Sequence, residues 1–190
     1  MDASQEILDF WLKECEPKDW YRVDPKLDDT IREKFGELWE TAASGKLSGW
    51  IGRPSSALAL IILLDQFPRN MFRGDARSFA TDSLALKLAK SAILREHDKK
   101  FDYPEKQFFY LPYMHAEISS EQDRGVRLFL QNGDAADNLE HARAHRWVIR
   151  KFGRFPYRNE ALGRSTTKPE QEFLDAGGYA EALRQVRSAG

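Results

Sequence analysis

Between Leu58 and Leu64 the chain carries no polar side chain, so a helix here is apolar on every face. Such a helix is buried, either in the core of a protein or in a membrane. The whole apolar run, Ala57 to Leu64, is far shorter than the roughly 20 residues that a bilayer requires. We therefore predict that Ala57–Phe67 is the central helix of a soluble fold, opened by Ser55 or Ser56.

The other segments repeat their apolar residues with helical spacing. Asp24 and Pro25 are typical of a helix start, and the helix after them carries Ile31 and Phe35 on one face. No segment alternates apolar and polar residues over the length of a strand, and no stretch rich in Ser, Pro or Gly divides the chain. We predict an all-α fold in which residues 1–190 form a single domain of about eight to nine helices.

A first helix is predicted near the N-terminus, with Ser4 as its N-cap and Leu8, Trp11 and Cys15 on its buried face. Cys15 is the only cysteine, so the chain forms no internal disulfide. This cysteine usage is typical of a reducing compartment.

A short phrase occurs twice, each time after an apolar stretch. Phe67-Pro68-Arg69-Asn70 precedes Gly74, and Phe155-Pro156-Tyr157-Arg158-Asn159 precedes Gly163. Proline stops a helix, and both Asn and Gly tolerate the left-handed backbone of a tight exit. We predict that two helices end alike, and the repeat suggests two similar halves built from antiparallel helix pairs.

The charge balance excludes several kinds of partner. The chain has 29 Lys and Arg against 30 Asp and Glu, a net charge of −1, so no overall basic field attracts nucleic acid or an anionic membrane. Residues 1–6 lack the basic start of a secretory signal. We expect a cytoplasmic protein with no cofactor and no metal. Its partner is then a small anionic metabolite or another protein, and the sequence leaves the oligomeric state open.

Three segments resemble the signature blocks of one protein family, namely Leu60–Asn70, Tyr110–Glu117 and Arg150–Asn159. The family is largely bacterial and is known only as domain of unknown function number nine hundred and twenty-four. The resemblance runs from Ile7 to Gly178. It implies a tetratricopeptide-like helical fold, and it implies no established activity, cofactor or substrate.

Polar side chains in or beside these blocks form a candidate site. Arg guanidinium groups match the geometry of carboxylates and phosphates, and an imidazole can act as acid or base near neutral pH. We predict catalytic roles for His115 and His145, and ligand binding by Asp65, Arg69, Arg154, Arg158 and Asn159.

A structural interpretation of the histidines stands beside the catalytic one. His145 lies on the apolar stripe of its helix, where a histidine is more often a satisfied core residue. A metal between His141 and His145 lacks further ligands nearby in the sequence. His115 and Glu117 are two positions apart, so on a helix they point to nearly opposite sides and are expected to meet separate partners.

The charged residues also have a structural interpretation. Asp65 ends the apolar helix and is expected to be buried, so it needs a cation, for which Arg69, Arg154 and Arg158 are the candidates. An ion-pair network of this kind would only hold the turns in place.

Two functions follow from these alternatives. The first is binding of a small anion, a carboxylate or a phosphate, in an Arg- and His-lined pocket, with catalysis as an extension. The second is a helical scaffold for protein interaction, in which the same groups are structural. The first predicts unpaired Arg nitrogens, and the second predicts that each is paired.

Overall fold

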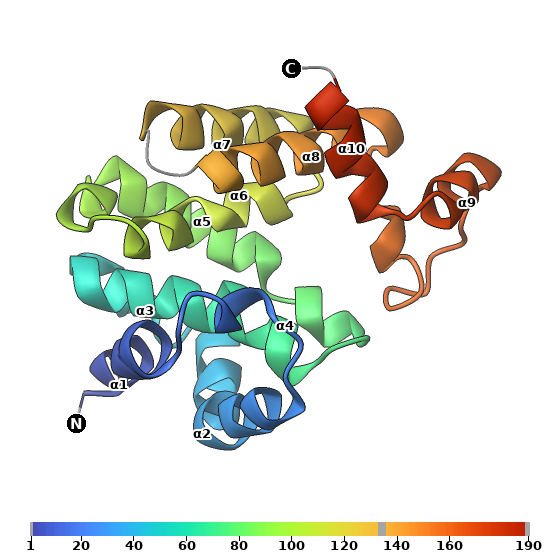
Figure 1. The fold of residues 1–190 in the computed structure, drawn as a ribbon. Helices are drawn as coiled ribbons and strands as arrows, with labels where there is room; N and C mark the ends of the chain where they lie inside the picture. The colour runs from blue at the N-terminus through green and yellow to red at the C-terminus, as the bar shows by residue number, and fades with distance from the viewer. Residues whose placement is uncertain (1, 133–135, 189–190) are drawn as a thin grey trace. The chain divides into compact units, whose positions relative to one another are not determined.

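The computed structural model describes residues 2–132 and 136–188 of the chain. Throughout these residues the structure is helical and contains no strand (Figure 1), so the predicted all-α fold is confirmed. The longer helices are α1 (Ala3–Asp9), α2 (Pro25–Ala43), α3 (Pro54–Asp65), α5 (Asp82–Leu94), α7 (Ser119–Gln131), α8 (Ala136–Phe152), α9 (Lys168–Asp175) and α10 (Tyr179–Ser188). The shorter segments are α4 (Phe67–Met71), α6 (Leu111–His115), the π-helical η1 (Phe10–Glu14), and the 3-10 turns η2 (Asp19–Tyr21), η3 (Ser48–Gly52), η4 (Ala76–Phe79), η5 (His97–Lys100), η6 (Glu105–Phe109) and η7 (Pro156–Arg158).

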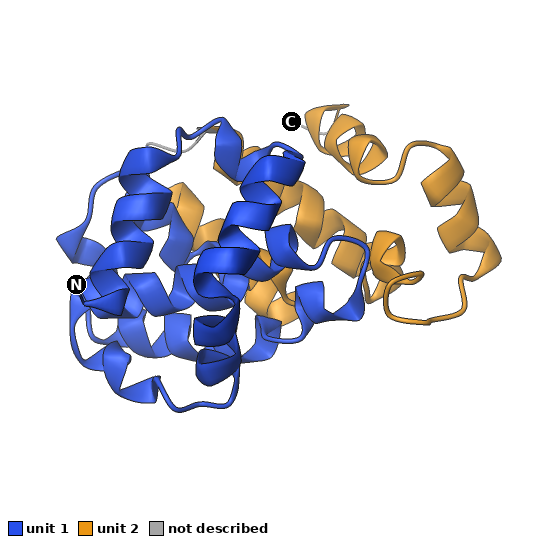
Figure 2. Cartoon of the chain, turned by 90° about the horizontal axis from the view of Figure 1, so that it is seen from below, with its two compact units in different colours: residues 1–112 blue, residues 113–190 orange. Residues whose placement is uncertain are grey.

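The chain divides into two compact units whose boundary falls between Pro112 and Tyr113 (Figure 2). Unit 1 is the N-terminal one and unit 2 the C-terminal one, and each contains one copy of the turn phrase. The similarity of the two halves stays a prediction, as does a tetratricopeptide-like pairing of the helices.

Unit 1 is built around α3. Every residue from Ala57 to Pro68 is buried, which confirms the prediction of a central apolar helix. Helices α1, α2, α4 and α5 all pack against α3. The aromatic rings of Trp11 and Phe35 meet Phe67 at centroid distances of 5.3 and 4.9 Å, so the end of the apolar segment is enclosed by rings.

The predicted N-cap is correct for α2 and wrong for α1. Asp24 accepts hydrogen bonds from the backbone N–H groups of Lys26 and Leu27, which confirms it as the N-cap of α2. The N-cap of α1 is Asp2 rather than Ser4, because the Asp2 carboxylate accepts from the backbone N–H of Ser4. A carboxylate at this position also complements the helix dipole.

Cys15 is buried at the end of the π-helical segment η1. Burial raises the pKa of its thiol to about 11, so the thiol stays protonated and unreactive at neutral pH.

The two turn phrases do not end their helices in the predicted way. Helices α3 and α8 end at Asp65 and Phe152, before each phrase begins, and each proline lies in the first turn of a new helical segment, α4 or η7. Proline suits that position because the first turn of a helix needs no donor from it. Gly74 and Gly163 do adopt the left-handed backbone, with φ of +76° and +60°.

The asparagines of the phrases have a role other than the predicted left-handed conformation. Asn159 has a φ of −59°, and Asn70 lies within α4. Both side-chain amides instead donate to a carboxylate, Asn70 to Asp28 at 2.8 Å and Asn159 to Glu170 at 3.4 Å.

Unit 2 packs α8 against α7 and α10. Its core consists of buried side chains from α8, α9, α10 and the turn between α8 and η7, namely Ala144, Val148, Ile149, Phe155, Phe173 and Ala182. Helix α9 packs against η7. The second turn phrase is thereby part of the core of unit 2.

None of the helices described is both long and apolar enough to cross a bilayer.

We predict that Asp28→Asn destabilises the protein by about 2 kcal/mol. Asp28 of α2 is buried and accepts from Asn70 at 2.8 Å and from two nitrogens of Arg73 at 2.5 and 3.0 Å. An asparagine there sets an NH2 group against one of these donors. Urea unfolding followed by circular dichroism measures the change in the free energy of unfolding.

The matched control is Asp29→Asn. Asp29 is the next residue, its side chain is 66% exposed, and it pairs only with the half-exposed Arg32. This variant should change the free energy of unfolding by about 0.5 kcal/mol or less. Equal effects at the two positions would contradict a special role for Asp28.

Candidate functional site

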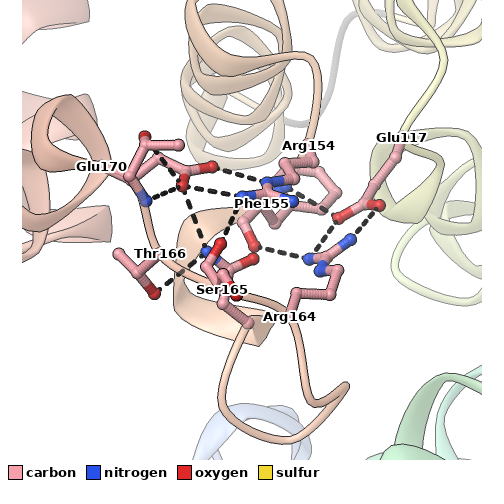
Figure 3. Close-up of polar contacts among 9 residues, drawn as sticks. Glu117, Arg154, Phe155, Arg164, Ser165, Thr166 and Glu170 are labelled. Atoms are coloured by element: carbon pink, nitrogen blue, oxygen red, sulfur yellow. Dashed lines mark hydrogen bonds and ion pairs between the residues drawn. The ribbon is translucent and has the colours of Figure 1, made fainter.

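The connection from the end of α8 to α9 is held by two Arg–carboxylate pairs (Figure 3). In the first pair, Arg154 donates from Nε and Nη2 to the two carboxylate oxygens of Glu170 at 2.6 and 2.8 Å. A further hydrogen bond of 2.8 Å joins Arg154 Nη2 to the carbonyl of Ser165. A bidentate pair of this kind fixes the direction of both side chains.

Glu170 is also the third residue of the α9 capping box. Its carboxylate accepts from the backbone N–H of Thr167 at 2.8 Å and from the Thr167 hydroxyl at 3.0 Å, as the Thr167-to-Glu170 spacing indicates. Hydrogen bonds from Arg154 outweigh the opposing effect of burial and, together with those from Thr167, lower the pKa of Glu170 to about 2.

In the second pair, Arg164 donates to both oxygens of Glu117 at 2.7 and 3.1 Å. Glu117 also accepts from the backbone N–H of Phe155 at 2.8 Å, while Arg164 donates to the Phe155 carbonyl at 3.0 Å. Burial alone would raise the pKa of Glu117, but the hydrogen bonds from Arg164 and Phe155 lower it below its ordinary value. Both polar groups of the Phe155 backbone are thus satisfied by one ion pair.

These pairs change the predicted roles of Arg154 and Asn159. The Arg154 guanidinium is bound by Glu170, and the buried Asn159 amide donates to Glu170 at 3.4 Å and to Thr166 at 3.3 Å. Two buried atoms beside them, Asn159 Oδ1 and Arg164 Nε, make no hydrogen bond within the described part of the chain. Both residues therefore contribute to holding the turn, and their binding of a ligand stays a prediction.

Arg158 is buried, and its guanidinium lies 4.4 Å from the centre of the Phe155 ring. Further interactions engage the same side chain, so Arg158 is not a free cation.

Two predicted ligand-binding residues, Asp65 and Arg69, belong to unit 1. Arg69 pairs with Asp82 at 2.8 Å, donates to the Ser78 carbonyl and lies 5.0 Å from the centre of the Phe79 ring. Asp65 is fully buried, accepts from the Gln66 amide at 2.5 Å and has further interactions. Of the three candidates for the cation of Asp65, Arg69 is thus engaged by Asp82 instead.

The predicted catalytic residues do lie together in unit 2. The rings of His115 and His145 are 6.3 Å apart, and the His145 ring lies 5.4 Å from Phe155 and 5.0 Å from Tyr179. His141 stacks on Tyr179, with its Nδ1 2.6 Å from the tyrosine hydroxyl. His141 and His145 thus both contact Tyr179, and His115 joins the group through His145.

The hydrogen bonds of His145 determine its tautomer. Its Nδ1 lies 2.9 Å from the His141 carbonyl oxygen, and a carbonyl only accepts, so Nδ1 carries the proton. Tyr179 is also within 3.4 Å of Nδ1. All hydrogen bonds of His145 to residues described here involve Nδ1, which leaves the Nε2 lone pair as an acceptor.

The surroundings of His145 keep it neutral. Loss of hydration, followed by the nearby His115 and Arg158, lowers the pKa of His145 to about 3, against the opposing hydrogen bond to His141. Burial likewise raises the pKa of the Tyr179 hydroxyl. At neutral pH the pair is therefore an uncharged imidazole next to an uncharged phenol.

His115 ends α6, while Glu117 lies between α6 and α7, so the two do not share a helix; Glu117 pairs with Arg164 and the His115 ring lies near that of His145. Sequence reasoning missed Tyr179, because nothing in its local pattern distinguishes it from a core aromatic residue. It also missed Glu170 as the partner of Arg154, although the capping box that contains Glu170 was readable.

No group of three or more His, Cys, Asp or Glu side chains in residues 2–132 and 136–188 is placed to hold a metal ion.

We predict that Glu170→Gln lowers the free energy of unfolding by about 2 kcal/mol at pH 7. The variant should also reduce the loss of stability that occurs as the pH falls into the acid range. The folded pKa of about 2 lies below the ordinary 4.5, so the contribution of Glu170 is complete above pH 4.5 and is lost as the pH falls toward 2. Urea unfolding at a series of pH values measures this slope. The exposed Glu172→Gln in the same helix should leave the slope unchanged.

A second prediction concerns the His145 ring. Long-range ¹H–¹⁵N NMR correlations at pH 7 should show a proton on Nδ1 and none on Nε2, with titration near pH 3. His97 is the control with the opposite tautomer, because its Nε2 lies 3.0 Å from the Ile51 carbonyl and must be the donor. A His145 signal that titrates near 6.5 would contradict the buried, neutral ring.

The chain matches the sequence model of a family described as bacterial protein of unknown function (DUF924) over residues 7–178. A solved structure of a protein of unknown function from Agrobacterium tumefaciens is similar to this chain, with 42% sequence identity and a TM-score of 0.86 over 92% of this chain and 97% of that one. No curated protein matches the sequence. With most of its length matched, this chain belongs to the DUF924 family.

Proposed function

We propose that unit 2 binds a small anionic ligand, a carboxylate or a phosphate, beside His145. The observation that carries this proposal is the half-buried imidazole of His145, whose Nδ1 is held by the His141 carbonyl while its Nε2 is left as an acceptor. A polar atom on a positioned ring, among aromatic side chains, is typical of a ligand site.

The electrostatic surroundings favour an anion. Among the side chains that lower the pKa of His145 is Arg158, whose guanidinium is positively charged at neutral pH. Arg158 lowers the pKa of Glu117 as well, so its charge acts at this part of unit 2 even though other groups engage it. An anion beside Nε2 would be stabilised by this positive potential.

The proposal assigns the ligand to the imidazoles rather than to the turn arginines. Arg154 and Arg164 are each occupied by a carboxylate of their own unit, as is Arg69 in unit 1. Replacing such a partner by an external anion would leave a buried carboxylate without its cation, which costs several kcal/mol.

A catalytic role for His115 and His145 depends on the bound anion. With a pKa of about 3, free His145 is a weak base. An anion offsets the repulsion from the basic neighbours and so shifts that pKa upward, which is the direction that acid–base catalysis requires, while the larger effect of desolvation remains.

The paired arginines favour a second candidate, a helical scaffold for protein interaction. Its predicted signature was that the turn arginines are matched by carboxylates, as Arg69, Arg154 and Arg164 are. Unit 2 also exposes Ile118 and Leu130, at 52% and 58%. A scaffold needs no contribution from His145 Nε2, and this difference separates the two candidates.

We predict that phosphate or a small carboxylate raises the melting temperature of the native protein and has no such effect on His145→Phe. A ligand at 100 times its dissociation constant adds about 2.7 kcal/mol to the free energy of unfolding. Phenylalanine keeps a planar ring against Phe155 and Tyr179 and removes the acceptor nitrogen. Differential scanning fluorimetry over a panel of anions measures the shift.

The matched control is His97→Phe, the same substitution at the histidine of unit 1. It should retain the ligand-induced shift. A panel without any hit, or a shift that survives in His145→Phe, would refute the proposal and favour the scaffold.

A further inference from the structure

The hydrogen-bonding state of His145 restricts which anions suit it. Nδ1 is a committed donor to the His141 carbonyl at 2.9 Å, so the ring offers a ligand one lone pair at Nε2 and no N–H. An acceptor of this kind needs a donor on the ligand.

We infer that the anion bound beside His145 carries its own O–H donor, as hydrogen phosphate and 2-hydroxycarboxylates do. This inference rests on the proposed function and narrows its ligand class. The anionic oxygens lie in the positive potential of Arg158, while the O–H group donates to Nε2.

Anions that only accept hydrogen bonds fit this arrangement poorly. Sulfate and a simple carboxylate have no O–H hydrogen at neutral pH, so their oxygen lone pairs would face the lone pair of Nε2. Protonating the ring would remove the conflict, but desolvation and the bases His115 and Arg158 oppose a second positive charge there.

The aromatic surroundings strengthen this discrimination. Phe155 and Tyr179 lie 5.4 and 5.0 Å from the His145 ring, so a ligand that covers Nε2 beside them would displace water from it. A polar atom that loses both water and its partner costs about 1–3 kcal/mol, whereas in open solvent water would replace the partner. The site should therefore distinguish a ligand that has an O–H donor from a similar ligand that lacks one.

The test uses two pairs of ligands matched in shape and size. Isothermal titration calorimetry at pH 7 compares phosphate, which keeps an O–H group, with sulfate, which has none. The second pair is lactate and propionate, which differ by the 2-hydroxyl group. We expect the O–H member of at least one pair to bind about tenfold more tightly or better.

The variant His145→Phe should bind both members of that pair with equal affinity, because it has no acceptor nitrogen. On the native protein, phosphate should also shift the ¹⁵N resonance of His145 Nε2, a readout that does not depend on the variant folding.

Equal binding within both pairs on the native protein overturns this inference and leaves the proposed anion site in place. A preference that persists in His145→Phe also overturns it, since another group would then read the hydroxyl. If none of the four ligands binds, the proposed function fails together with the inference.

Discussion

The carboxylate of Glu170 holds the second turn of the chain in place. It accepts from Arg154, from the backbone and hydroxyl of Thr167, and from the Asn159 amide, so one buried group joins the start of α9 to the residues that follow α8. A buried charge is tolerated only with such partners. Phe155 lies in the same connection, and the Glu117–Arg164 pair satisfies its backbone N–H and carbonyl groups. The Phe155 ring packs beside the His145 ring.

Unit 1 shows the same arrangement with different residues. The asparagine of its turn phrase donates to Asp28, and Arg73 supplies the charge that Asp28 needs. In both units a buried amide close to a proline meets a carboxylate, and an arginine neutralises that carboxylate. The recurrence of arginine near these turns thus has a structural cause, because a carboxylate cannot be buried beside an amide alone. Anion recognition by free guanidinium groups is not needed to explain it.

Among the residues described, both His145 Nε2 and Arg164 Nε make no hydrogen bond, but Nε2 is an acceptor whereas Arg164 Nε is a donor. The Nδ1 of His145 completes a hydrogen bond within α8, while its Nε2 remains an acceptor among bases and aromatic rings. Desolvation lowers the pKa of His145 to about 3, so the ring is neutral at pH 7. A neutral ring with this pKa accepts a hydrogen bond but is a weak base. This is the reason to place ligand recognition at the imidazoles and stability at the arginines.

The sequence by itself determined the helical class, the buried segment from Ala57, the N-cap at Asp24 and the left-handed glycines at 74 and 163. These features depend on backbone sterics and on apolar periodicity, which act over a few residues. Only the tertiary structure decided the partner of each arginine and the contacts of His141 and His145 with Tyr179. Arg164 meets a carboxylate 47 residues away and His141 a hydroxyl 38 residues away. Any Arg can pair with any nearby carboxylate, so the choice is made by which side chains the packing of the helices brings within a few ångströms.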